Sequence, residues 1–288
     1  MLHENEAASI LANACSSEFA FTTEPKEGKI EIIAVIDGLL KIDVERLNRV
    51  NTIGEMMIAT RHTNFAVKKG DVLAGTRIIP LVIRQEKMDK VVEIFDNRSF
   101  IEIKPFKEKT AGIIITGNEV FNKRVKDEFG PVIRRKLEDY PVQIVSQQIL
   151  GDDPEAIKQA ILDNVSMGVD MAFCTGGMSV DPDDTTPTTI IKTGARMISY
   201  GAPVLPVAMF LLAYYNEKIP IIGLLGCVMY SKRTIFDLML PRLIADDKIE
   251  SKNLECLGHG GLCLNCEICT FPNCGFGKSD HFREMKVK

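Results

Sequence analysis

The stretch MAFCTGGMSVDPDDTTP, residues 171–187, decides the fold class of this chain. Its first five residues are apolar or small, which predicts a buried strand, and Gly176-Gly177 ends that strand. Thr186-Pro187 then begins a helix that we expect to end at Gly194, because proline is favoured in the first turn of a helix. A strand followed by a loop and a helix is the repeating unit of parallel α/β sheets.

The same alternation continues on both sides of this stretch. Apolar runs predict further strands, at AGIIIT (111–116), VQIVSQQIL (142–150) and IPIIGLLG (219–226). Helical spacing of apolar residues predicts helices, at 129–140, 154–168 and 230–245. This order predicts a three-layer α/β domain over residues 109–248, in which helices cover both faces of a mostly parallel sheet.

Residues 1–108 predict a smaller, strand-rich domain. A helix is expected from Asn5 to Ala14, with no recognisable cap before it. The run KIEIIAVIDGLLKIDVE (29–45) predicts two strands that form a hairpin around Asp37-Gly38. Further short strands are expected at 56–60, 64–67 and 76–83.

Residues 249–288 form a cysteine-rich tail. The spacing C-x2-C-x2-C-x4-C places Cys263, Cys266, Cys269 and Cys274 close enough to share a metal. It resembles the bacterial ferredoxin run, but with four residues before the last cysteine and glycine where proline is expected after it. An iron–sulfur cluster and zinc both fit four thiolates, and Cys256, His259 and His281 are alternative ligands.

Charge and hydropathy exclude several classes of partner. The 35 basic and 39 acidic side chains give a net charge of −4 without a basic block, which argues against a nucleic-acid partner. The most apolar stretch, 204–215, is well short of the roughly 20 residues that cross a bilayer. The acidic N-terminal sequence lacks the features of a signal peptide, so we expect a cytoplasmic protein without a membrane partner.

Polar loops follow three of the predicted strands, at 116–120, 151–154 and 175–187. Because ligands bind beyond the carboxyl ends of parallel strands, these loops are the candidate site. Gly176 and Gly177 expose backbone amides, and Thr185 or Thr186 caps a helix whose free N–H groups favour an anion. Carboxylates of the same loops, at Glu119, Asp181, Asp183 and Asp184, would repel that anion unless Mg²⁺ stood between them. The sequence therefore predicts metal-assisted phosphoryl or oxyanion chemistry.

On these motifs, residues 111–245 resemble the molybdopterin-binding domain of molybdopterin molybdotransferases, gephyrin-like proteins and molybdopterin adenylyltransferases. The resemblance depends on four stretches in order, TGNEV (116–120), DDP (152–154), TGGMSVDPDDTTP (175–187) and PIIGLLGCVMYSKRTIFDLMLPRLIA (220–245). The preceding VKKGDVLAGTRIIPLVI, which ends at Ile83, is similar to a subgroup described only as molybdopterin-binding proteins.

This resemblance implies a site and a reaction. It implies catalytic carboxylates at Glu119, at Asp153 or its neighbour Asp152, and at Asp184. It implies contacts to the pterin or its phosphate from Thr116, Gly117, Thr175, Gly176, Gly177, Ser179, Asp183, Thr186 and Gly226. The implied chemistry is Mg²⁺-dependent insertion of molybdate into adenylylated molybdopterin with release of AMP. Self-association into a homo-oligomer and a molybdoenzyme that receives the product are implied as well.

Two departures leave the role of the chain open. Ser199-Tyr200-Gly201-Ala202-Pro203 stands where molybdotransferases have Lys-Pro-Gly-Lys-Pro, and 223–228 lacks the prolines and asparagine of their Gly-Leu-Pro-Gly-Asn-Pro loop. The alternative is therefore a non-catalytic carrier or sensor of the molybdenum cofactor, with a redox or structural metal in its tail. A third interpretation, similarity to competence-damage-inducible proteins that share the domain, predicts pyrophosphatase activity on a nucleotide sugar.

Overall fold

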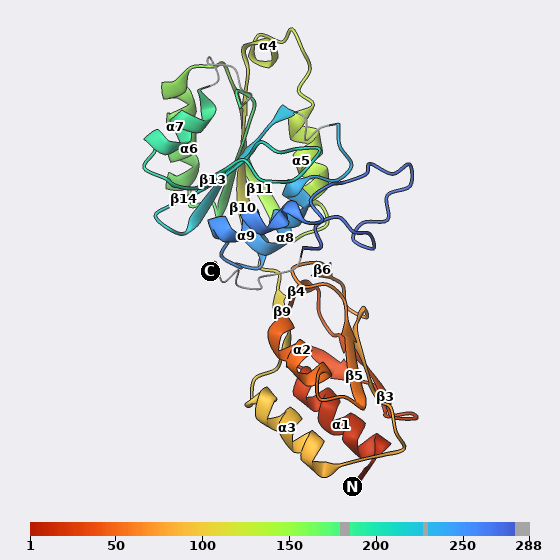
Figure 1. Cartoon of the computed structure of the whole chain (residues 1–288). Coiled ribbons are helices and arrows are strands. Elements are labelled where there is room, and N and C mark those ends of the chain that lie inside the picture. Colours follow the sequence, from red (N-terminus) through yellow and green to blue (C-terminus); the bar gives the residue numbers. More distant parts are fainter. Residues whose placement is uncertain (179–184, 227–229, 280–288) are drawn as a thin grey trace, which may run out of the picture. The chain divides into compact units, whose positions relative to one another are not determined.

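The computed structural model describes residues 1–178, 185–226 and 230–279. Contacts between residues divide the chain into two units, Met1–Phe106 and Lys107–Lys288 (Figure 1). The second unit contains the predicted α/β sheet and also the cysteine-rich segment.

The first unit combines helices with short strands in small sheets. The strands form a four-stranded sheet in the order β2-β3-β7-β5, a three-stranded sheet in the order β6-β4-β9, and the pair β1-β8. The elements are β1 (Leu2–His3), α1 (Glu4–Cys15), β2 (Ala20–Thr22), β3 (Lys29–Ala34), β4 (Gly38–Ile42), α2 (Val44–Asn51), β5 (Met56–Thr60), β6 (Ala66–Val67), β7 (Val72–Ile78), β8 (Val82–Ile83), α3 (Gln85–Phe95) and β9 (Ile101–Pro105).

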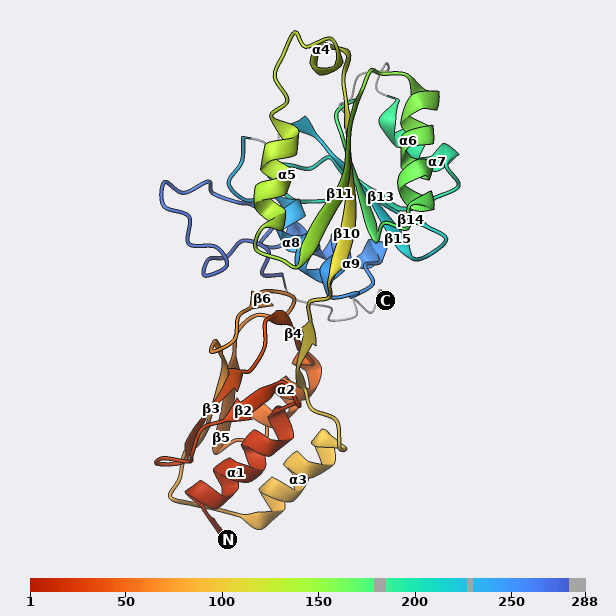
Figure 2. The same ribbon diagram turned by 180° about the vertical axis from the view of Figure 1, so that it is seen from behind.

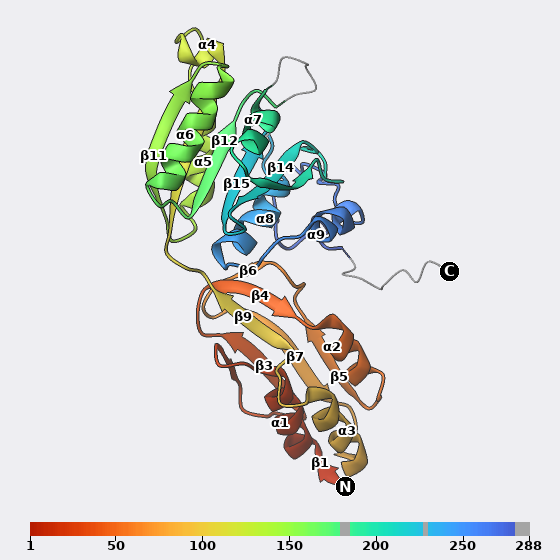
Figure 3. The same cartoon turned by 90° about the vertical axis from the view of Figure 1, so that its left-hand side faces the viewer.

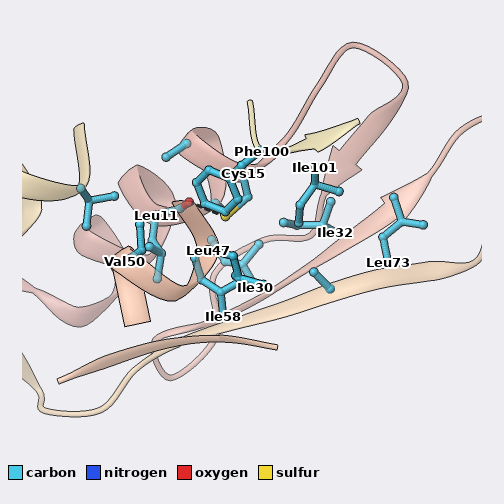
Figure 4. Packing of buried hydrophobic residues seen from close by; sticks show 14 of the residues in the cluster. Leu11, Cys15, Ile30, Ile32, Leu47, Val50, Ile58, Leu73, Phe100 and Ile101 are labelled. Atoms are coloured by element: carbon cyan, nitrogen blue, oxygen red, sulfur yellow. Dashed lines mark hydrogen bonds between the residues drawn. The ribbon is translucent and has the colours of Figure 1, made fainter. Parts of the chain in front are cut away.

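The core of this unit lies between α1 and the strands. Figure 4 shows Leu11 and Cys15 of α1 with Ile32 of β3 and Phe100 among the buried side chains. The Cys15 thiol donates to the Leu11 carbonyl oxygen at 3.0 Å, and burial raises the pKa of this thiol. Cys15 is therefore a small core residue.

The hairpin predicted at Asp37-Gly38 is wrong. Both strands exist, but β3 pairs with β2 and β7, whereas β4 pairs with β6 and β9 in a different sheet. Gly38 is needed for close approach, since a Cβ at this position would lie 2.5 Å from the Lys104 carbonyl oxygen of β9. Asp37 accepts a hydrogen bond from the Lys69 amide at 2.8 Å, which anchors the crossing between the two sheets.

The expectation that α1 begins without a cap is also wrong. Nδ1 of His3 accepts a hydrogen bond from the Asn5 amide, and Glu6 accepts one from the His3 amide, both at 3.3 Å. This reciprocal pair is a capping box in which histidine takes the place that serine or threonine usually holds.

The second unit is built on one six-stranded sheet in the order β11-β10-β12-β15-β14-β13. The first four strands are parallel, and β14 runs antiparallel to both of its neighbours, so the predicted mostly parallel sheet is confirmed. Figure 3 shows β11, β12, β15 and β14 across this sheet. The elements are β10 (Lys109–Thr116), α4 (Asn118–Phe121), α5 (Phe129–Leu137), β11 (Val142–Leu150), α6 (Pro154–Ser166), β12 (Met171–Thr175), α7 (Thr186–Lys192), β13 (Arg196–Tyr200), β14 (Phe210–Tyr215), β15 (Ile219–Leu224), α8 (Ile235–Ile244), α9 (Ser251–Glu255) and the 3₁₀ turn η2 (Cys256–Gly258).

Helices cover both faces of this sheet, as predicted. Helices α6 and α7 lie on one face and α5 and α8 on the other (Figures 1 and 2). Strand β12 alternates between the two layers: Ala172 and Cys174 pack with Ile161 of α6, while Phe173 meets Phe236 of α8 edge to face at 5.5 Å between ring centroids. Because both sides of the strand are buried, all five of its residues are shielded from solvent.

The predicted helix at 230–245 begins later than expected, at Ile235. Thr234 and Asp237 form a capping box at its start, and every residue of α8 is buried. Within the described ranges, no helix combines the length and the apolar character that a bilayer crossing requires.

Candidate functional site

The carboxyl ends of the four parallel strands lie level with one another. Thr116 of β10 pairs with Leu150 of β11, Ile115 of β10 pairs with Thr175 of β12, and Thr175 pairs with Leu224 of β15. The loops that follow these strands therefore start at one edge of the sheet, which we call the carboxyl edge.

The loops after β10 and β12 diverge at this edge. Strand β10 leads through α5, on one face of the sheet, to its neighbour β11, whereas β12 leads to α7 on the other face (Figures 1 and 2). A crevice forms where neighbouring strands of a parallel sheet lead in opposite directions, and ligands of such folds bind there. The structure thus places the candidate site between the ends of β10 and β12.

Gly176 and Gly177 form the turn that leaves β12. Their φ angles are +89° and +54°, in the region that glycine adopts without strain. A Cβ on Gly176 would lie 2.2 Å from the Thr116 carbonyl oxygen, and one on Gly177 would lie 2.7 Å from Thr186 Oγ1. The turn therefore packs its backbone directly against β10 and the start of α7.

Three buried threonines surround this turn, and each is at most 2% exposed. Thr116 Oγ1 donates to the Thr175 carbonyl oxygen at 3.0 Å, and the Thr186 amide donates to the Gly177 carbonyl oxygen at 3.3 Å. Thr175 Oγ1 is buried and has no hydrogen-bond partner among the described residues. A buried hydroxyl left unpaired costs about 1–3 kcal/mol, so a ligand that reached this atom would recover part of that cost.

A second contact joins the loops after β10 and β11. The Asn118 amide donates to Asp152 Oδ2 at 3.0 Å, and the Asp152 amide donates to Asn118 Oδ1 at 3.3 Å. Gly117, which has a φ of +137° and open space around its missing Cβ, turns the chain into the short helix α4. Glu119 lies in α4 and is exposed, so Asp152 and Glu119 belong to two loops that Asn118 connects.

Asp153 lies at the same edge, but its carboxylate hydrogen-bonds the backbone at the start of α6. It is the N-cap of α6, and its Oδ1 accepts a hydrogen bond from the Glu155 amide at 3.1 Å. Thr185 takes the N-cap position of α7 without a side-chain hydrogen bond to the helix. Gly226 follows β15, and Phe129 of α5 lies 3.6 Å from the position that its Cβ would take.

The predicted residues Ser179, Asp183 and Asp184, together with Asp181 and Cys227, lie outside the described residues.

Tyr200 is a residue of this edge that the sequence did not single out. It ends β13, and its hydroxyl donates to the Met178 carbonyl oxygen at 3.4 Å, directly after the Gly176-Gly177 turn. The signal was present, because Tyr200 belongs to the segment that stands where molybdotransferases have Lys-Pro-Gly-Lys-Pro.

The four tail cysteines lie together in the second unit. Cys263, Cys266, Cys269 and Cys274 all line one hollow of about 240 Å³. A hydrogen bond from the Phe271 amide, together with Arg233 and Lys232, lowers the pKa of the Cys269 thiol. In the part of the chain that the structure describes, no three His, Cys, Asp or Glu side chains are arranged to hold one metal ion. Cys174, by contrast, is fully buried, which raises its pKa to about 12.

Comparisons with known proteins concern the second unit. A family model described as "probable molybdopterin binding domain" matches residues 112–245. A CinA-like protein of Mycobacterium sp. (strain JLS) is 37% identical over 86 residues, which are 30% of this chain and 20% of that protein. A CinA-like protein of Mycobacterium avium (strain 104) is 33% identical over 94 residues, which are 33% and 22% of the two chains. This chain thus spans about a fifth of the length of these curated relatives.

Two solved structures are similar at lower identity. The molybdopterin biosynthesis enzyme MoaB from Thermus thermophilus is 17% identical, with a TM-score of 0.39 over 47% of this chain and 91% of that one. The tungsten cofactor synthesizing protein MoaB from Pyrococcus furiosus is 17% identical, with a TM-score of 0.40 over 50% and 99% of the two chains. The matched residues 112–245 begin within β10 and contain β12, the Gly176-Gly177 turn and α7, so this part of the chain is similar to the family described as "probable molybdopterin binding domain".

Proposed function

We propose that the carboxyl edge of the second unit binds molybdopterin or its adenylate. The family match over residues 112–245 supports this ligand, and the match includes the loops after β10, β11, β12 and β15. The position supports it as well, because the crevice between diverging strands is where ligands of parallel sheets bind. The activity, the substrates and the partners of the whole protein are part of the same proposal.

The observation that carries the proposal is the unpaired Thr175 hydroxyl beside the Gly176-Gly177 turn. Thr116, Thr175 and Thr186 supply hydroxyl groups, which suit the oxygen and nitrogen atoms of a pterin or the oxygens of a phosphate. The two glycines let this turn pack its backbone directly against Thr116 of β10 and Thr186 of α7, which holds the three threonines together at the carboxyl edge. The residues present therefore fit the ligand that the family implies.

We extend the proposal to Mg²⁺-dependent insertion of molybdate with release of AMP. Glu119 and Asp152 offer carboxylate oxygens on neighbouring loops, which is the ligand chemistry that Mg²⁺ prefers. The ion, when bound, would supply positive charge between these carboxylates and the ligand phosphates. Asn118 would orient Asp152 through their two hydrogen bonds, while Asp153 would serve the fold as the cap of α6.

The alternative is a carrier or sensor that binds the cofactor without turnover. It is favoured by Tyr200, which lies beside the Gly176-Gly177 turn in the segment where transferases have two lysines to hold an anion. A cytoplasmic setting, a homo-oligomer and a molybdoenzyme that receives the cofactor belong to either version of the proposal. The metal predicted at Cys263, Cys266, Cys269 and Cys274 is separate, because it depends on other residues.

A pair of isosteric substitutions tests the binding site. Thr175→Val removes the unpaired hydroxyl and keeps the shape of the side chain. We expect this variant to bind molybdopterin about tenfold more weakly, as loss of one hydrogen bond to a ligand implies. We also expect its free energy of unfolding to stay level or rise, because the buried hydroxyl has no partner in the described part of the chain.

Thr189→Val is the matched control. Thr189 Oγ1 is also buried without a described partner, but it lies in α7, one turn beyond Thr186. Its variant should gain stability in the same way and keep the affinity of the wild type. Equal affinity of all three proteins would refute the assignment of Thr175. With adenylylated molybdopterin, release of AMP that requires Mg²⁺ and is lost in Glu119→Gln supports the enzyme, whereas tight binding without AMP release supports the carrier.

A further inference from the structure

The tail cysteines line a hollow in the second unit. Cys263, Cys266, Cys269 and Cys274 all border it, and its volume is about 240 Å³. Much of the remaining lining is apolar, from Leu262, Leu264, Phe271 and Phe276. Four cysteine residues thus border one concave surface that belongs entirely to the second unit.

The size of the hollow bears on the kind of metal centre. Around a single zinc ion, with bonds of about 2.3 Å, the four sulfur atoms stand only about 3.8 Å apart, which leaves no hollow between them. An iron–sulfur cluster places several iron and sulfide ions between its thiolates and therefore needs an open space of the kind that these cysteines border. The two x2 spacings of the segment are also those of the bacterial [4Fe–4S] run.

Two cations just before α8 hold the cysteine segment in place. Lys232 donates through Nζ to the carbonyl oxygens of Cys266 at 2.9 Å and Glu267 at 2.7 Å. The Arg233 guanidinium lies 4.8 Å from the centre of the Phe271 ring and hydrogen-bonds the Cys269 thiol. It also donates to Asp237 Oδ1 at 2.9 Å, and Asp237 is a buried residue of α8. The segment is therefore anchored to the covered helix of the α/β unit.

These cations are suited to the charge of such a cluster. Four thiolates and an iron–sulfide core together carry net negative charge, and nearby positive groups and hydrogen bonds to sulfur stabilise it and set its potential. Lys232 and Arg233 supply two positive charges on the wall of the hollow, and Arg233 supplies a hydrogen bond to a ligating sulfur. The sequence alone leaves zinc and an iron–sulfur cluster as alternatives, whereas the hollow and its two cations favour an iron–sulfur cluster.

We infer that Cys263, Cys266, Cys269 and Cys274 bind a [4Fe–4S] cluster, which Lys232 and Arg233 fix to the start of α8. This site is independent of molybdopterin binding, because it uses none of the residues assigned to the pterin. It equips the second unit with a one-electron centre of its own.

Anaerobic reconstitution of the full-length chain with ferrous iron, sulfide and a thiol reductant tests this inference. We expect about four iron and four sulfide ions per chain, a broad visible absorption, and a paramagnetic signal after reduction with dithionite. Cys263→Ser and Cys274→Ser should each lose most of the bound iron. Cys256→Ser is the matched control, because Cys256 lies in η2 outside the lining of the hollow and should keep the full amount.

Three results would overturn the assignment. These are one zinc ion per chain in a protein that takes up no iron, a content of about two iron ions per chain, and an iron content that Cys263→Ser and Cys274→Ser leave unchanged. Loss of iron from a misfolded cysteine variant would not be informative, so Lys232→Met is a second test. This substitution keeps every thiol and removes only the two hydrogen bonds to the loop carbonyl oxygens. We expect this variant to assemble the cluster and to lose it several-fold faster in air than the wild type, and an unchanged rate of loss would contradict the anchoring role.

Discussion

Thr116 of β10 donates a hydrogen bond of 3.0 Å from its hydroxyl to the carbonyl oxygen of Thr175 in β12. This bond joins the two strand ends at the point where their loops diverge. It holds the Thr175 carbonyl while the Thr175 hydroxyl itself has no described partner. The same two strand ends thus contain one hydroxyl that makes a hydrogen bond and one buried hydroxyl without a described partner.

Loss of the Thr116 hydroxyl should weaken the fold as well as the site. Thr116→Val leaves a buried carbonyl oxygen without this donor, so we expect the free energy of unfolding to fall by about 1 kcal/mol. Thr116→Ser keeps the hydroxyl and should lose less. Urea denaturation followed by circular dichroism measures both, and equal stability of the wild type and Thr116→Val would show that this bond contributes nothing.

Alanine substitutions at two glycines with nearly the same φ angle should distinguish the stability cost of crowding from that of backbone strain. Gly176 and Gly194 have φ angles of +89° and +91°, but only Gly176 has an atom within 4 Å of its missing Cβ. Gly194→Ala should therefore cost about 1 kcal/mol from strain alone, whereas Gly176→Ala should cost roughly 3 kcal/mol or more through its clash with Thr116. Thermal unfolding of the two variants gives the comparison, and equal losses would mean that the turn can move away from β10.

Stability should fall in acid partly through Glu217. A hydrogen bond from Arg196 lowers the pKa of this carboxyl to about 2. A carboxyl whose pKa is lower in the folded protein stabilises it above the ordinary pKa of glutamate, about 4.3, and that contribution is lost as the pH falls toward 2. Glu217→Gln should unfold with a shallower dependence on pH between about 4.5 and 2. The effect is small because Glu217 is solvent-exposed. If the free energy of unfolding had the same pH dependence in the wild type and in Glu217→Gln, the Arg196–Glu217 ion pair would contribute nothing because solvent screens it.

The described cysteines should differ sharply in reactivity. Burial raises the pKa of Cys174 to about 12, so this thiol should resist iodoacetamide until the protein unfolds. Cys266 and Cys269 are exposed, and the Phe271 amide and Arg233 lower the pKa of Cys269, so Cys269 should react first in the metal-free protein. Peptide mapping by mass spectrometry after short labelling orders the sites. Early labelling of Cys174 in folded protein would contradict the packing of β12.

Elements with a strong apolar pattern could be predicted from the sequence. The predicted bounds of β11 and β12 agree with the structure, because β12 is buried on both faces and β11 is bounded by clear turn signals. Helices α2 and α3 gave no usable pattern, since each buries only two residues, Leu47 and Val50 in α2 and Met88 and Val91 in α3. The strand pairing of β3 and β4 could not be predicted, because it depends on partners that lie far away in the sequence.

The sequence indicates which loops lie at the carboxyl edge, but it does not predict the contacts between them. Gly176 and Gly177 stand out in any sequence, since two glycines directly after an apolar strand predict a tight turn. The pairing of Asn118 with Asp152 and that of Tyr200 with Met178 depend on strands that are neighbours only in the folded sheet. A local pattern also cannot distinguish the capping aspartate, Asp153, from the neighbouring Asp152 that contacts Asn118.

The most direct test of the proposed function is a calorimetric titration of the full-length chain with molybdopterin under anaerobic conditions, with and without Mg²⁺. The proposal predicts saturable binding that is weaker in Thr175→Val and unchanged in Thr189→Val. Absence of saturable binding under both conditions would contradict it and would mean that the carboxyl edge of this domain serves another ligand.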